Sequence, residues 1–477
     1  MPTSKPTFDS RVRVRMYRHG LGDCFLLRFP KKDSYFHIVI DSGVLLGTKD
    51  AAARMMEVAE DIKRETGGEI DVLVVTHEHW DHVSGFSGKQ ARSVWDTIKT
   101  KAVWLAWTED PKDVLANQLR GQRDEDMKKL RVGLQSAGAA LQMDEQAADR
   151  INELLSFNGW QLDGLGATDS DEGGTPEAMQ YVRQRVDSPT FLKPGDIQKL
   201  SGVTGVRVFV LGPPHDEKKI KKSDPSKAHP EVYEELENGF AVGAADGNSI
   251  VEAVPPFPTE MQLGENNYTD VASWKSSELN EQQSQALQVA LQGYASDTHR
   301  KLSAASLAEL ENLAIALDGD TNNSSLVLAF ELAPQGRVLL FAADAQVGNW
   351  LSWQEVTWKG ASGVTANSLL EKAVLYKVGH HGSHNATLKD LGLELMTNKD
   401  LMAVIPVNQE MAAKKKWNMP FPPLWNRLKE LTRGRVVLSD SDVALPNDAA
   451  LSRLTATERT RFKQNVIASE IAIDIFI

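Results

Sequence analysis

One segment, Thr76-His77-Glu78-His79-Trp80-Asp81-His82, restricts the fold and chemistry of this chain more than any other. It places the imidazoles of His77, His79 and His82 and the carboxylate of Asp81 within six residues, directly after the apolar run 71–75, which predicts a buried strand. Two histidines at spacing i, i+2 can converge on one metal ion, and the aspartate and histidine that follow can reach a second ion. A polar loop whose histidines only form hydrogen bonds does not explain this density. The segment therefore predicts a two-metal site at the end of a strand.

The apolar pattern around this segment predicts an α/β fold. Residues 51–64 have helical spacing and lie between predicted strands at 36–40 and 71–75. Such a strand–helix–strand order indicates a helical layer packed on a sheet. Further strands are predicted at residues 11–17, 24–29, 101–107, 206–211, 325–332, 337–344, 373–378, 401–407, 435–440 and within 466–477. Further helices are predicted near residues 89–100, 388 and 424.

Two stretches interrupt this alternation and are predicted to be insertions. Residues 108–200 contain leucines in helical phase, which predicts a helical pair over 111–157. Residues 215–321 have helical spacing at 279–291 and 302–317, so this stretch is also predicted to be largely helical. A length of 477 residues suits two or three domains, or one large domain with insertions. The pattern favours one α/β domain with two insertions.

Further motifs follow in a fixed order: Gly20-Leu21-Gly22-Asp23-Cys24, Asp41-Ser42-Gly43, Asn322-Asn323-Ser324-Ser325, Asp344 and Val378-Gly379-His380-His381-Gly382-Ser383. Together with the His-x-His-x-Asp-His segment, they resemble the metallo-β-lactamase fold superfamily and are most similar to the ComEC-like hydrolase domain and its soluble relatives. The resemblance implies an αββα sandwich of the metallo-β-lactamase type with two largely helical insertions. The implied organisation is a first part of the domain at 10–107, a helical insertion at 108–200, a core strand at 201–214, a second insertion at 215–321 and a second part of the domain at 322–477.

The resemblance also implies two divalent metal ions as cofactors, either Zn²⁺ or Mn²⁺. The implied ligands are His77 and His79 for the first ion, Asp81, His82 and His380 for the second ion, and Asp344 as the bridge between them. Asp41 would support the loop at 77–82, called the metal loop below, rather than bind metal.

Two ligand assignments remain open. The family's order of motifs favours His380 over its neighbour His381, since adjacent side chains leaving a strand point to opposite faces. Many binuclear relatives supply a third histidine to the first metal, and His215 is the candidate for this position. ComEC-like domains have a proline at this strand end without an obligatory histidine, so a loop or surface position is the favoured interpretation of His215. Without that ligand the first site is more open, and Mn²⁺ suits it as well as Zn²⁺.

A second acidic motif, Asp318-Gly319-Asp320-Thr321-Asn322, resembles a calcium-binding loop only superficially. Such a loop needs glycine at its sixth position and glutamate at its twelfth, which here are Asn323 and Ala329. We therefore predict no calcium site at this motif.

The implied activity is hydrolysis by a hydroxide held between two metal ions. Asp81 would orient this hydroxide, while His381, Ser383 or His384 would hydrogen-bond a phosphoryl oxygen or assist the leaving group. The favoured substrate is a phosphoester or phosphodiester, as in a nucleotide or nucleic acid. The lysines within 218–222 and 414–416 suit phosphate, and the ComEC-like motifs point to the same substrate class.

Two alternatives to this function stay open. The same metals can support carbonyl hydrolysis of a lactone, a thioester or a β-lactam. A different class is a partner-binding subunit, in which the helical insertions recruit another protein and the metal site is vestigial. The intact ligand set counts against the second alternative.

Charge and composition narrow the expected partners. The chain has 53 Lys and Arg against 65 Asp and Glu, and this net charge of −12 argues against a long basic groove that wraps duplex DNA. Cys24 is the single cysteine, and the first ten residues lack the apolar core of a signal peptide. No apolar run is long enough to span a bilayer. We expect a cytoplasmic protein with a phosphate-containing substrate, nucleic acid among the candidates, no membrane contact, and a protein partner at the helical insertions.

Overall fold

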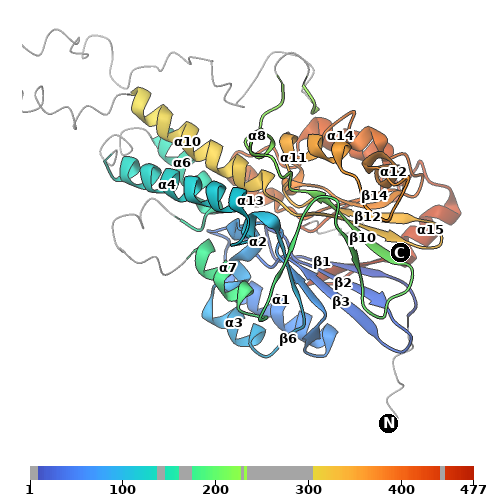
Figure 1. The fold of residues 1–477 in the computed structure, drawn as a ribbon. Helices are drawn as coiled ribbons and strands as arrows, with labels where there is room; N and C mark the ends of the chain where they lie inside the picture. Colours follow the sequence, from blue (N-terminus) through green and yellow to red (C-terminus); the bar gives the residue numbers. More distant parts are fainter. Residues whose placement is uncertain (1–8, 137–144, 161–173, 227–229, 234–303, 441–445) are drawn as a thin grey trace, which may run out of the picture.

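Two β-sheets face each other, and helices cover the outer face of each sheet (Figure 1). The computed structural model describes residues 9–136, 145–160, 174–226, 230–233, 304–440 and 446–477. The predicted αββα sandwich is confirmed by this arrangement.

The first sheet has eight strands within the described residues, in the order β16-β17-β1-β2-β3-β5-β7-β8. Their bounds are β16 (Val466–Ala468), β17 (Ala472–Phe476), β1 (Arg13–Tyr17), β2 (Phe25–Pro30), β3 (Tyr35–Ile40), β5 (Val72–Val74), β7 (Val103–Ala106) and β8 (Thr190–Leu192). Strand β5 is parallel to both β3 and β7, whereas β17, β1, β2 and β3 are antiparallel neighbours. The carboxyl ends of β3, β5 and β7 therefore lie at the same edge of the sheet.

The second sheet has seven strands within the same residues, in the order β15-β14-β13-β12-β11-β10-β9. Their bounds are β15 (Val436–Leu438), β14 (Met402–Ile405), β13 (Ala373–Lys377), β12 (Arg337–Phe341), β11 (Val327–Leu332), β10 (Val206–Gly212) and β9 (Ile197–Lys199). Strands β12 to β15 are parallel, so their carboxyl ends also share one edge. A separate two-stranded sheet pairs β4 (Glu69–Ile70) with β6 (Lys99–Thr100).

The main apolar core lies between the two sheets. The rings of Phe29 in β2 and Phe330 in β11 stack across it, with their centroids 5.7 Å apart. Alternation along β1 sends Val14 into this core and its neighbour Arg15 to the outer face, where Arg15 Nε lies 3.1 Å from Asp61 Oδ2. Strand β1 thus separates apolar from charged side chains, as its alternating sequence predicts.

Helices cover the outer faces of both sheets (Figure 1). Over the first sheet lie α1 (Ala51–Thr66), α3 (Lys89–Trp95) and α7 (Thr175–Arg183), and over the second lie α11 (Val347–Ser352), α12 (Ala366–Glu371) and α14 (Pro422–Leu431). Met55, Val58 and Ile62 of α1 share one apolar cluster with Leu73 of β5, which matches the predicted helical face. Other helical segments are α2 (Trp80–Val83), η1 (Ser84–Phe86), η2 (Trp107–Glu109), α8 (Glu217–Ile220), η8 (Trp353–Glu355), η9 (His380–Gly382), η10 (Leu393–Leu395), α13 (Gln409–Lys414) and α15 (Ala456–Asn465). Within the described ranges, we find no helix with the length and apolar character needed to span a bilayer.

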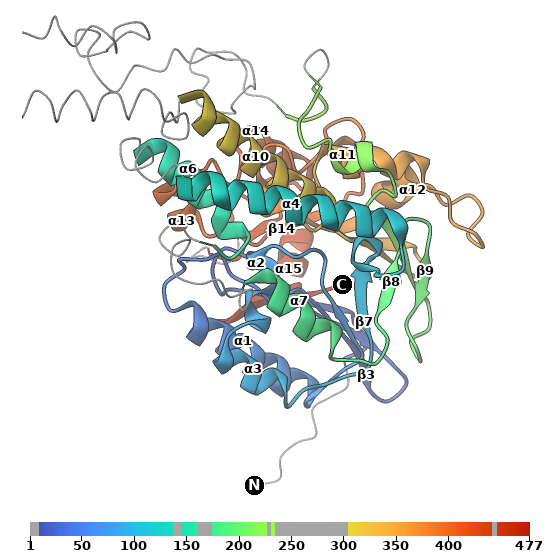
Figure 2. The same ribbon diagram turned by 60° about the vertical axis from the view of Figure 1, so that its left-hand side comes forward.

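Three long helices from the two predicted insertions lie side by side at one end of the sandwich (Figures 1 and 2). They are α4 (Val114–Ser136), α6 (Glu145–Phe157) and α10 (Ala304–Asn323). Their facing side chains form a small core of their own, made of Leu130, Leu134, Ile151, Leu155, Ala314 and Leu317. The two insertions, far apart in the sequence, therefore pack against each other.

The structure differs from the sequence expectations at several segments. Residues 190–199 of the predicted 108–200 insertion form β8 and β9, which extend both sheets and are too short to show alternation. The helix predicted near 89–100 ends at Trp95, because the chain then pairs as β6. The helix predicted near Leu388 does not form, and the chain there runs through turns. The helix predicted at 279–291 lies outside the described residues.

Candidate metal centre

The predicted metal-binding segments meet at one edge of the sandwich. Residues 77–82 follow β5 and continue into α2, Asp344 follows β12, and His380-His381 follow β13. The backbone N–H of Leu326, next to β11, donates to the carbonyl oxygen of Thr76 at 2.9 Å, which joins the two sheets here. The shared carboxyl edge of the parallel strands therefore gathers residues that are far apart in the sequence.

Four buried side chains form the centre of this cluster. Asp81, His82, Asp344 and His381 each place a ligand atom within 4.8 Å of the others. His82 Nε2 lies 3.1 Å from Asp344 Oδ2, and His381 Nε2 lies 2.9 Å from Asp81 Oδ2. Imidazole nitrogens and carboxylate oxygens are the ligands that Zn²⁺ and Mn²⁺ accept in proteins. The structure thus brings together Asp81, His82 and the predicted bridging residue Asp344.

His77 and His79, the predicted ligands of the first metal, lie beside these four residues. His77 Nε2 is 3.1 Å from His79 Nδ1, and the His77 ring centroid is 4.2 Å from that of His82. His77 Nδ1 lies 3.3 Å from Ser325 Oγ at the start of β11. The second nitrogen of His79, Nε2, is 3.7 Å from Asp318 Oδ1 in α10. This part of the site therefore contains a carboxylate that the sequence motifs did not indicate.

His380 and His381 both lie at the site, but their partners differ. His381 Nδ1 donates to the carbonyl oxygen of Pro406 at 2.6 Å, and Nε2 faces Asp81. His380 Nδ1 lies 3.1 Å from Ser383 Oγ, and its buried Nε2 has no hydrogen-bond partner. The sequence favours His380 as a ligand of the second metal, whereas the structure brings His381 into the group of four. Ser383, a predicted catalytic residue, contacts His380.

Two other predicted residues lie among different neighbours. His384 is half-buried, and its ring centroid is 6.0 Å from that of Phe421. The His215 side chain is 44% exposed, and its Nε2 lies 3.0 Å from Asp113 Oδ2. The His215 ring also packs on Trp107, with a centroid separation of 4.2 Å. The structure therefore places His215 in a surface position and not with the first-metal pair.

Burial keeps three of the histidines neutral. It lowers the pKa of His79 and of His380 to about 4. Burial also lowers the pKa of His77 well below its usual value, and the neighbouring His82 adds to this effect. These three imidazoles are therefore uncharged at pH 7, which is the form that binds metal.

His82 and His381 have the opposite shift. Burial alone would lower the pKa of His82, but Asp344 and Asp81 outweigh it and raise the pKa well above its usual value. Burial also opposes charging of His381, and its hydrogen bond with Asp81 raises the pKa nonetheless. Both nitrogens of His82 face carboxylates, because Nδ1 also lies 2.8 Å from Asp41 Oδ2. A divalent cation can replace a proton between such a nitrogen and oxygen.

The charges of the buried groups also fit divalent cations. Five carboxyl groups and one ammonium group are buried at this edge: Asp23, Asp41, Asp81, Asp318, Asp344 and Lys377. Burial, with Asp81 and Asp344 nearby, raises the pKa of Asp318 to about 8, so this acid is mostly protonated at pH 7 without cations. Fully ionised, the six groups carry four more negative charges than positive ones, and uncompensated buried charge is costly. Two divalent cations supply that missing charge. Two buried atoms at the site, Asp81 Oδ1 and His380 Nε2, also lack a hydrogen-bond partner and are available to a cation.

Asp41 and a glycine hold the metal loop against β3. Asp41 has a positive φ of 57°, and its carboxylate accepts a hydrogen bond from the backbone N–H of Thr76 at 2.8 Å and contacts His82. These contacts fit the supporting role that the resemblance implies for Asp41. At Gly43, a Cβ atom would lie 2.4 Å from the backbone carbonyl carbon of Asp81. Only glycine allows the two loops to approach this closely.

Replacing Gly43 by alanine is expected to push the metal loop away from β3 and to weaken metal binding by about 10- to 100-fold, as when a supporting group of a metal ligand is lost. Isothermal titration with Zn²⁺ or Mn²⁺ measures this change. Gly88→Ala is the matched control, because Gly88 has a φ of −72° and no atom within 4 Å of the added Cβ. Equal affinities of Gly43→Ala and wild type would contradict the role of this close approach.

Lys377 is a buried residue of the site that the sequence analysis missed. The whole residue is 1% exposed, and Nζ donates to the Ala343 carbonyl oxygen at 3.0 Å and contacts Asp344 and Asp23. Burial opposes its charge, but Asp23 and Asp344 outweigh this effect and raise the pKa of Lys377. A lysine inside the apolar run 373–378 was the available signal, because a buried ammonium needs a buried partner.

The helices of the two insertions form a wall over the site. The Phe157 ring, at the end of α6, has its centroid 5.8 Å from that of His79 and 6.0 Å from that of His380. Glu78, inside the metal loop, forms an ion pair with Arg123 of α4. Residues of α4, α6 and α10, which belong to the two predicted insertions, therefore contact the predicted metal-binding segments directly.

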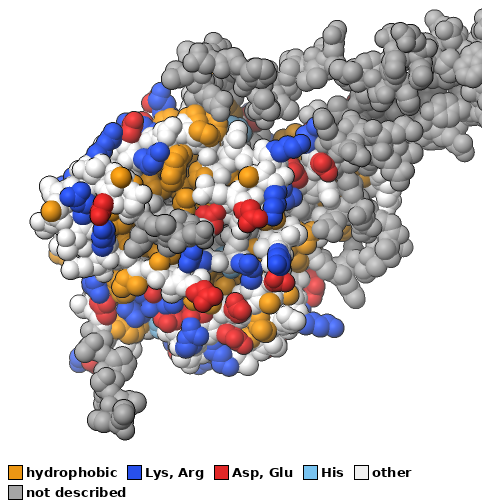
Figure 3. Space-filling model, turned by 180° about the vertical axis from the view of Figure 1, so that it is seen from behind, with side chains coloured by type: hydrophobic (Ala, Val, Ile, Leu, Met, Phe, Trp, Pro, Cys, Tyr) orange, Lys and Arg blue, Asp and Glu red, His pale blue; other side chains and the backbone are white. Residues whose placement is uncertain are grey.

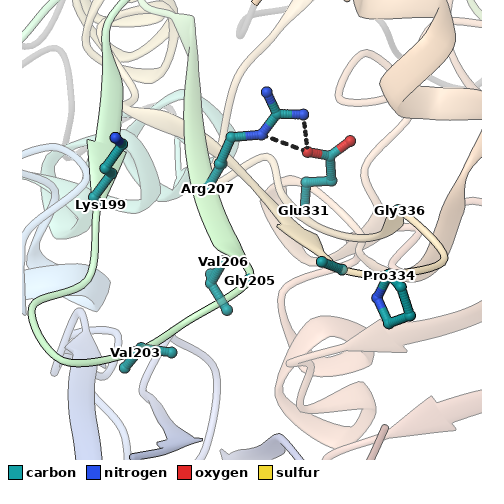
Figure 4. A pocket seen from close by; sticks show the side chains of 9 residues that line it. Lys199, Val203, Gly205, Val206, Arg207, Glu331, Pro334 and Gly336 are labelled. Atoms are coloured by element: carbon teal, nitrogen blue, oxygen red, sulfur yellow. Dashed lines mark hydrogen bonds and ion pairs between the residues drawn. The ribbon is translucent and has the colours of Figure 1, made fainter.

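A separate groove of about 440 Å³ lies at the opposite end of the second sheet (Figure 4). It is lined by residues of β9, β10 and the β11–β12 turn, where Arg207 Nε donates to Glu331 Oε2 at 2.8 Å. Strand β12 begins beside this groove at Arg337 and ends near Asp344. The length of the strand thus separates the groove from the metal centre.

Comparison with known proteins agrees with this geometry. No curated protein matches the chain. The family model described as the Metallo-beta-lactamase superfamily matches residues 18–154, a range that contains the motifs at 20–24, 41–43 and 77–82. The two facing sheets and their outer helices have the fold type of that superfamily. Residues 18–154 are therefore identified as a metallo-beta-lactamase superfamily domain, in an αββα sandwich that the rest of the chain completes.

Proposed function

We propose that this chain is a hydrolase that uses two divalent metal ions, Zn²⁺ or Mn²⁺, and cleaves phosphoesters or phosphodiesters, as in the ComEC-like group that its motifs resemble. The superfamily match and the buried Asp/His cluster support its coarser part, a metal-dependent hydrolase. The observation that carries the proposal is the convergence of Asp81, His82, Asp344 and His381 beside the pair His77 and His79.

Each side chain has a role in this proposal. His77 and His79 would hold one ion, Asp81, His82 and His381 would hold the other, and Asp344 would serve as a ligand of the pair. The bound ions would supply a water-derived nucleophile at neutral pH and would neutralise charge that develops on the attacked phosphorus. Asp81 Oδ2 faces His381, and Asp81 Oδ1 has no partner, so this second oxygen is available to orient the attacking water.

His380 is suited to accept a proton or to act as an additional metal ligand. Ser383 Oγ donates to Asn385 Oδ1 at 3.2 Å, so its lone pairs are free to accept from His380 Nδ1 at 3.1 Å. That contact puts the single proton of the neutral ring on Nδ1 and leaves a lone pair on the buried Nε2. Ser383 thus acts in this proposal by fixing the ring of His380.

A cationic loop near the wall of the site supports a phosphate substrate. Lys415 Nζ lies 5.2 Å above the ring centroid of Trp417. Trp417 stacks on Phe157 with a centroid separation of 5.5 Å, and Phe157 in turn contacts His380. Lys414 pairs with Glu410, whereas Lys415 lies on the same side of the protein as the metal centre, where it can attract an anion.

Other cationic groups are paired with acids. Lys219 forms an ion pair with Glu355, and Lys221 forms one with Glu217. Among the described residues on the face seen in Figure 3, basic and acidic side chains are interspersed and form no broad basic area. This distribution favours a small nucleotide or a single-stranded end over a wrapped duplex, because duplex binding requires many neutralised phosphates.

A panel of substrates tests the proposal. Wild-type protein loaded with Zn²⁺ or Mn²⁺ is expected to hydrolyse bis(4-nitrophenyl) phosphate or a single-stranded oligonucleotide in preference to a lactone, a thioester or a β-lactam. His79→Ala is expected to lose more than about 100-fold of this rate, because it removes a metal ligand rather than a supporting group. His215→Ala is the matched control and should stay within about twofold of wild type, since His215 lies on the surface.

Different outcomes separate the alternatives. Exclusive hydrolysis of the lactone, thioester or β-lactam would replace the phosphoester proposal by the carbonyl one. Equally low metal content in wild type and His79→Ala, with no hydrolysis by either, would overturn the enzyme proposal and leave the partner-binding function.

A further inference from the structure

We propose that Asp318 is a positioning residue that accepts a hydrogen bond from His79 Nε2 and thereby directs His79 Nδ1 toward the first metal. This inference rests on the proposed function, because it concerns the same site. His79 Nδ1 lies 3.1 Å from His77 Nε2, so these two nitrogens face a common point. The other ring nitrogen of His79 faces Asp318 Oδ1 at 3.7 Å. One end of the ring is thus aimed at the metal pair and the other at a carboxylate.

His79 Nε2 and Asp318 Oδ1 could form a hydrogen bond with each other. His79 Nε2 and Asp318 Oδ1 are both buried, and neither has a hydrogen-bond partner. A buried donor or acceptor without a partner is rare and calls for an explanation. A movement of about 0.5 Å would bring the pair to hydrogen-bond distance. Within the described ranges, Asp318 forms no ion pair with a lysine or an arginine, so a buried salt bridge does not account for this carboxylate.

The position of the ring proton decides which nitrogen of His79 can bind metal. A proton on Nδ1 would occupy the side that faces His77, whereas a proton on Nε2 leaves the Nδ1 lone pair free. Histidines that bind metal usually donate their second N–H to a carboxylate or carbonyl oxygen, which fixes the tautomer and the ring orientation. Asp318 is placed to accept this N–H, and it comes from the second insertion rather than from the sandwich.

Asp318 is itself held in place. Asn322 Nδ2 donates to Asp318 Oδ2 at 3.1 Å, which leaves Oδ1 to face His79. One turn later in α10, Asn323 Nδ2 donates to the carbonyl oxygen of Ile220 at 3.0 Å, and Asn323 Oδ1 accepts from the backbone N–H of Gln346 at 3.1 Å. The end of α10 is therefore fastened to the loop that follows β12. The carboxylate has a fixed position relative to the metal loop.

Isothermal titration of the full chain with Zn²⁺ tests the inference. Asp318→Ala is expected to bind two ions, as wild type does, with the affinity of one site reduced about 10- to 100-fold, as for other groups that orient a metal ligand. Asp318→Asn keeps an acceptor oxygen and is expected to recover most of that affinity. Asp320→Ala is the matched control, because Asp320 is a half-buried acid on the same helix. It should bind both ions as wild type does.

A spectroscopic readout separates positioning from a general structural effect. In the Zn²⁺-loaded wild type, the ¹⁵N shifts of the His79 ring should show a proton on Nε2 and a metal on Nδ1. In Asp318→Ala this pattern should weaken, while Asp318→Asn restores it. Wild-type affinity and ¹⁵N shifts in Asp318→Ala would overturn the inference. Loss of one ion at saturating Zn²⁺ would also overturn it, because Asp318 would then be a direct ligand. Absence of Zn²⁺ binding in wild type would overturn the proposed function as well.

Discussion

Asp344→Ala is expected to abolish hydrolysis, by about 1,000-fold or more, and to weaken the binding of both metal ions while the protein stays folded. Asp344 Oδ2 faces His82 at 3.1 Å, and Oδ1 accepts from the backbone N–H of His380 at 3.0 Å. The carboxylate therefore lies between the segments from the two sheets. Losing it removes the group that contacts both ions in the proposed site, and two-metal chemistry depends on that arrangement.

Metal content after dialysis, measured by mass spectrometry, and turnover of the best substrate check this expectation. Asp390→Ala is the control, because it makes the same substitution at an exposed aspartate. Circular dichroism of both variants establishes that they are folded. Full activity of Asp344→Ala with two bound ions would show that the bridging role belongs to another residue.

Lys377→Met is expected to lower the free energy of unfolding of the metal-free protein by about 3–5 kcal/mol, the range found when one partner of a buried ion pair is removed. The Lys377 residue is 1% exposed, and its ammonium contacts Asp23 and Asp344. Methionine has a similar volume but leaves both carboxylates without their cation. The loss should be smaller in the metal-loaded protein, because divalent ions then compensate the same charge.

Urea unfolding in the presence of a chelator measures this effect. Lys372→Met is the matched control, because Lys372 precedes the same strand, its side chain is 47% exposed, and its ion pair with Glu331 is 4.0 Å long. That variant should lose less than about 1 kcal/mol. Combining Asp23→Asn with Lys377→Met should recover part of the stability. If Lys377→Met were no less stable than Lys372→Met, the buried ammonium would not be what balances these acids.

The sandwich and most of the site could be predicted from local sequence patterns. The strands around the site are apolar runs of four or more residues, and the loop at 77–82 carries four candidate ligands within six residues. The same patterns could not show which of His380 and His381 is the candidate ligand of the second metal. Alternation applies to an extended strand, whereas both residues have positive φ values, of 41° and 54°, in a turn beyond β13. Such a turn redirects both side chains.

Asp318 could not be found in this way, because its role depends on tertiary packing. The motif around it lacks the glycine and the glutamate that a calcium-binding loop requires. In the structure the motif is the end of helix α10, which reaches His79 only because the apolar faces of α4, α6 and α10 pack together. A local sequence pattern cannot predict a contact between segments that are far apart in the chain.

The sequence separation of the ligands has a consequence for how the protein acquires its metals during synthesis. Asp81 and His381, in direct contact in the folded protein, are 300 residues apart in the chain. At a translation rate of about 5–20 residues per second, the metal loop leaves the ribosome roughly 15–60 s before His381 does. In that interval the loop offers an ion only part of its final ligand set, and partial sets bind weakly and exchange readily. The ions available once His381 has emerged would therefore decide the metal content of the mature protein.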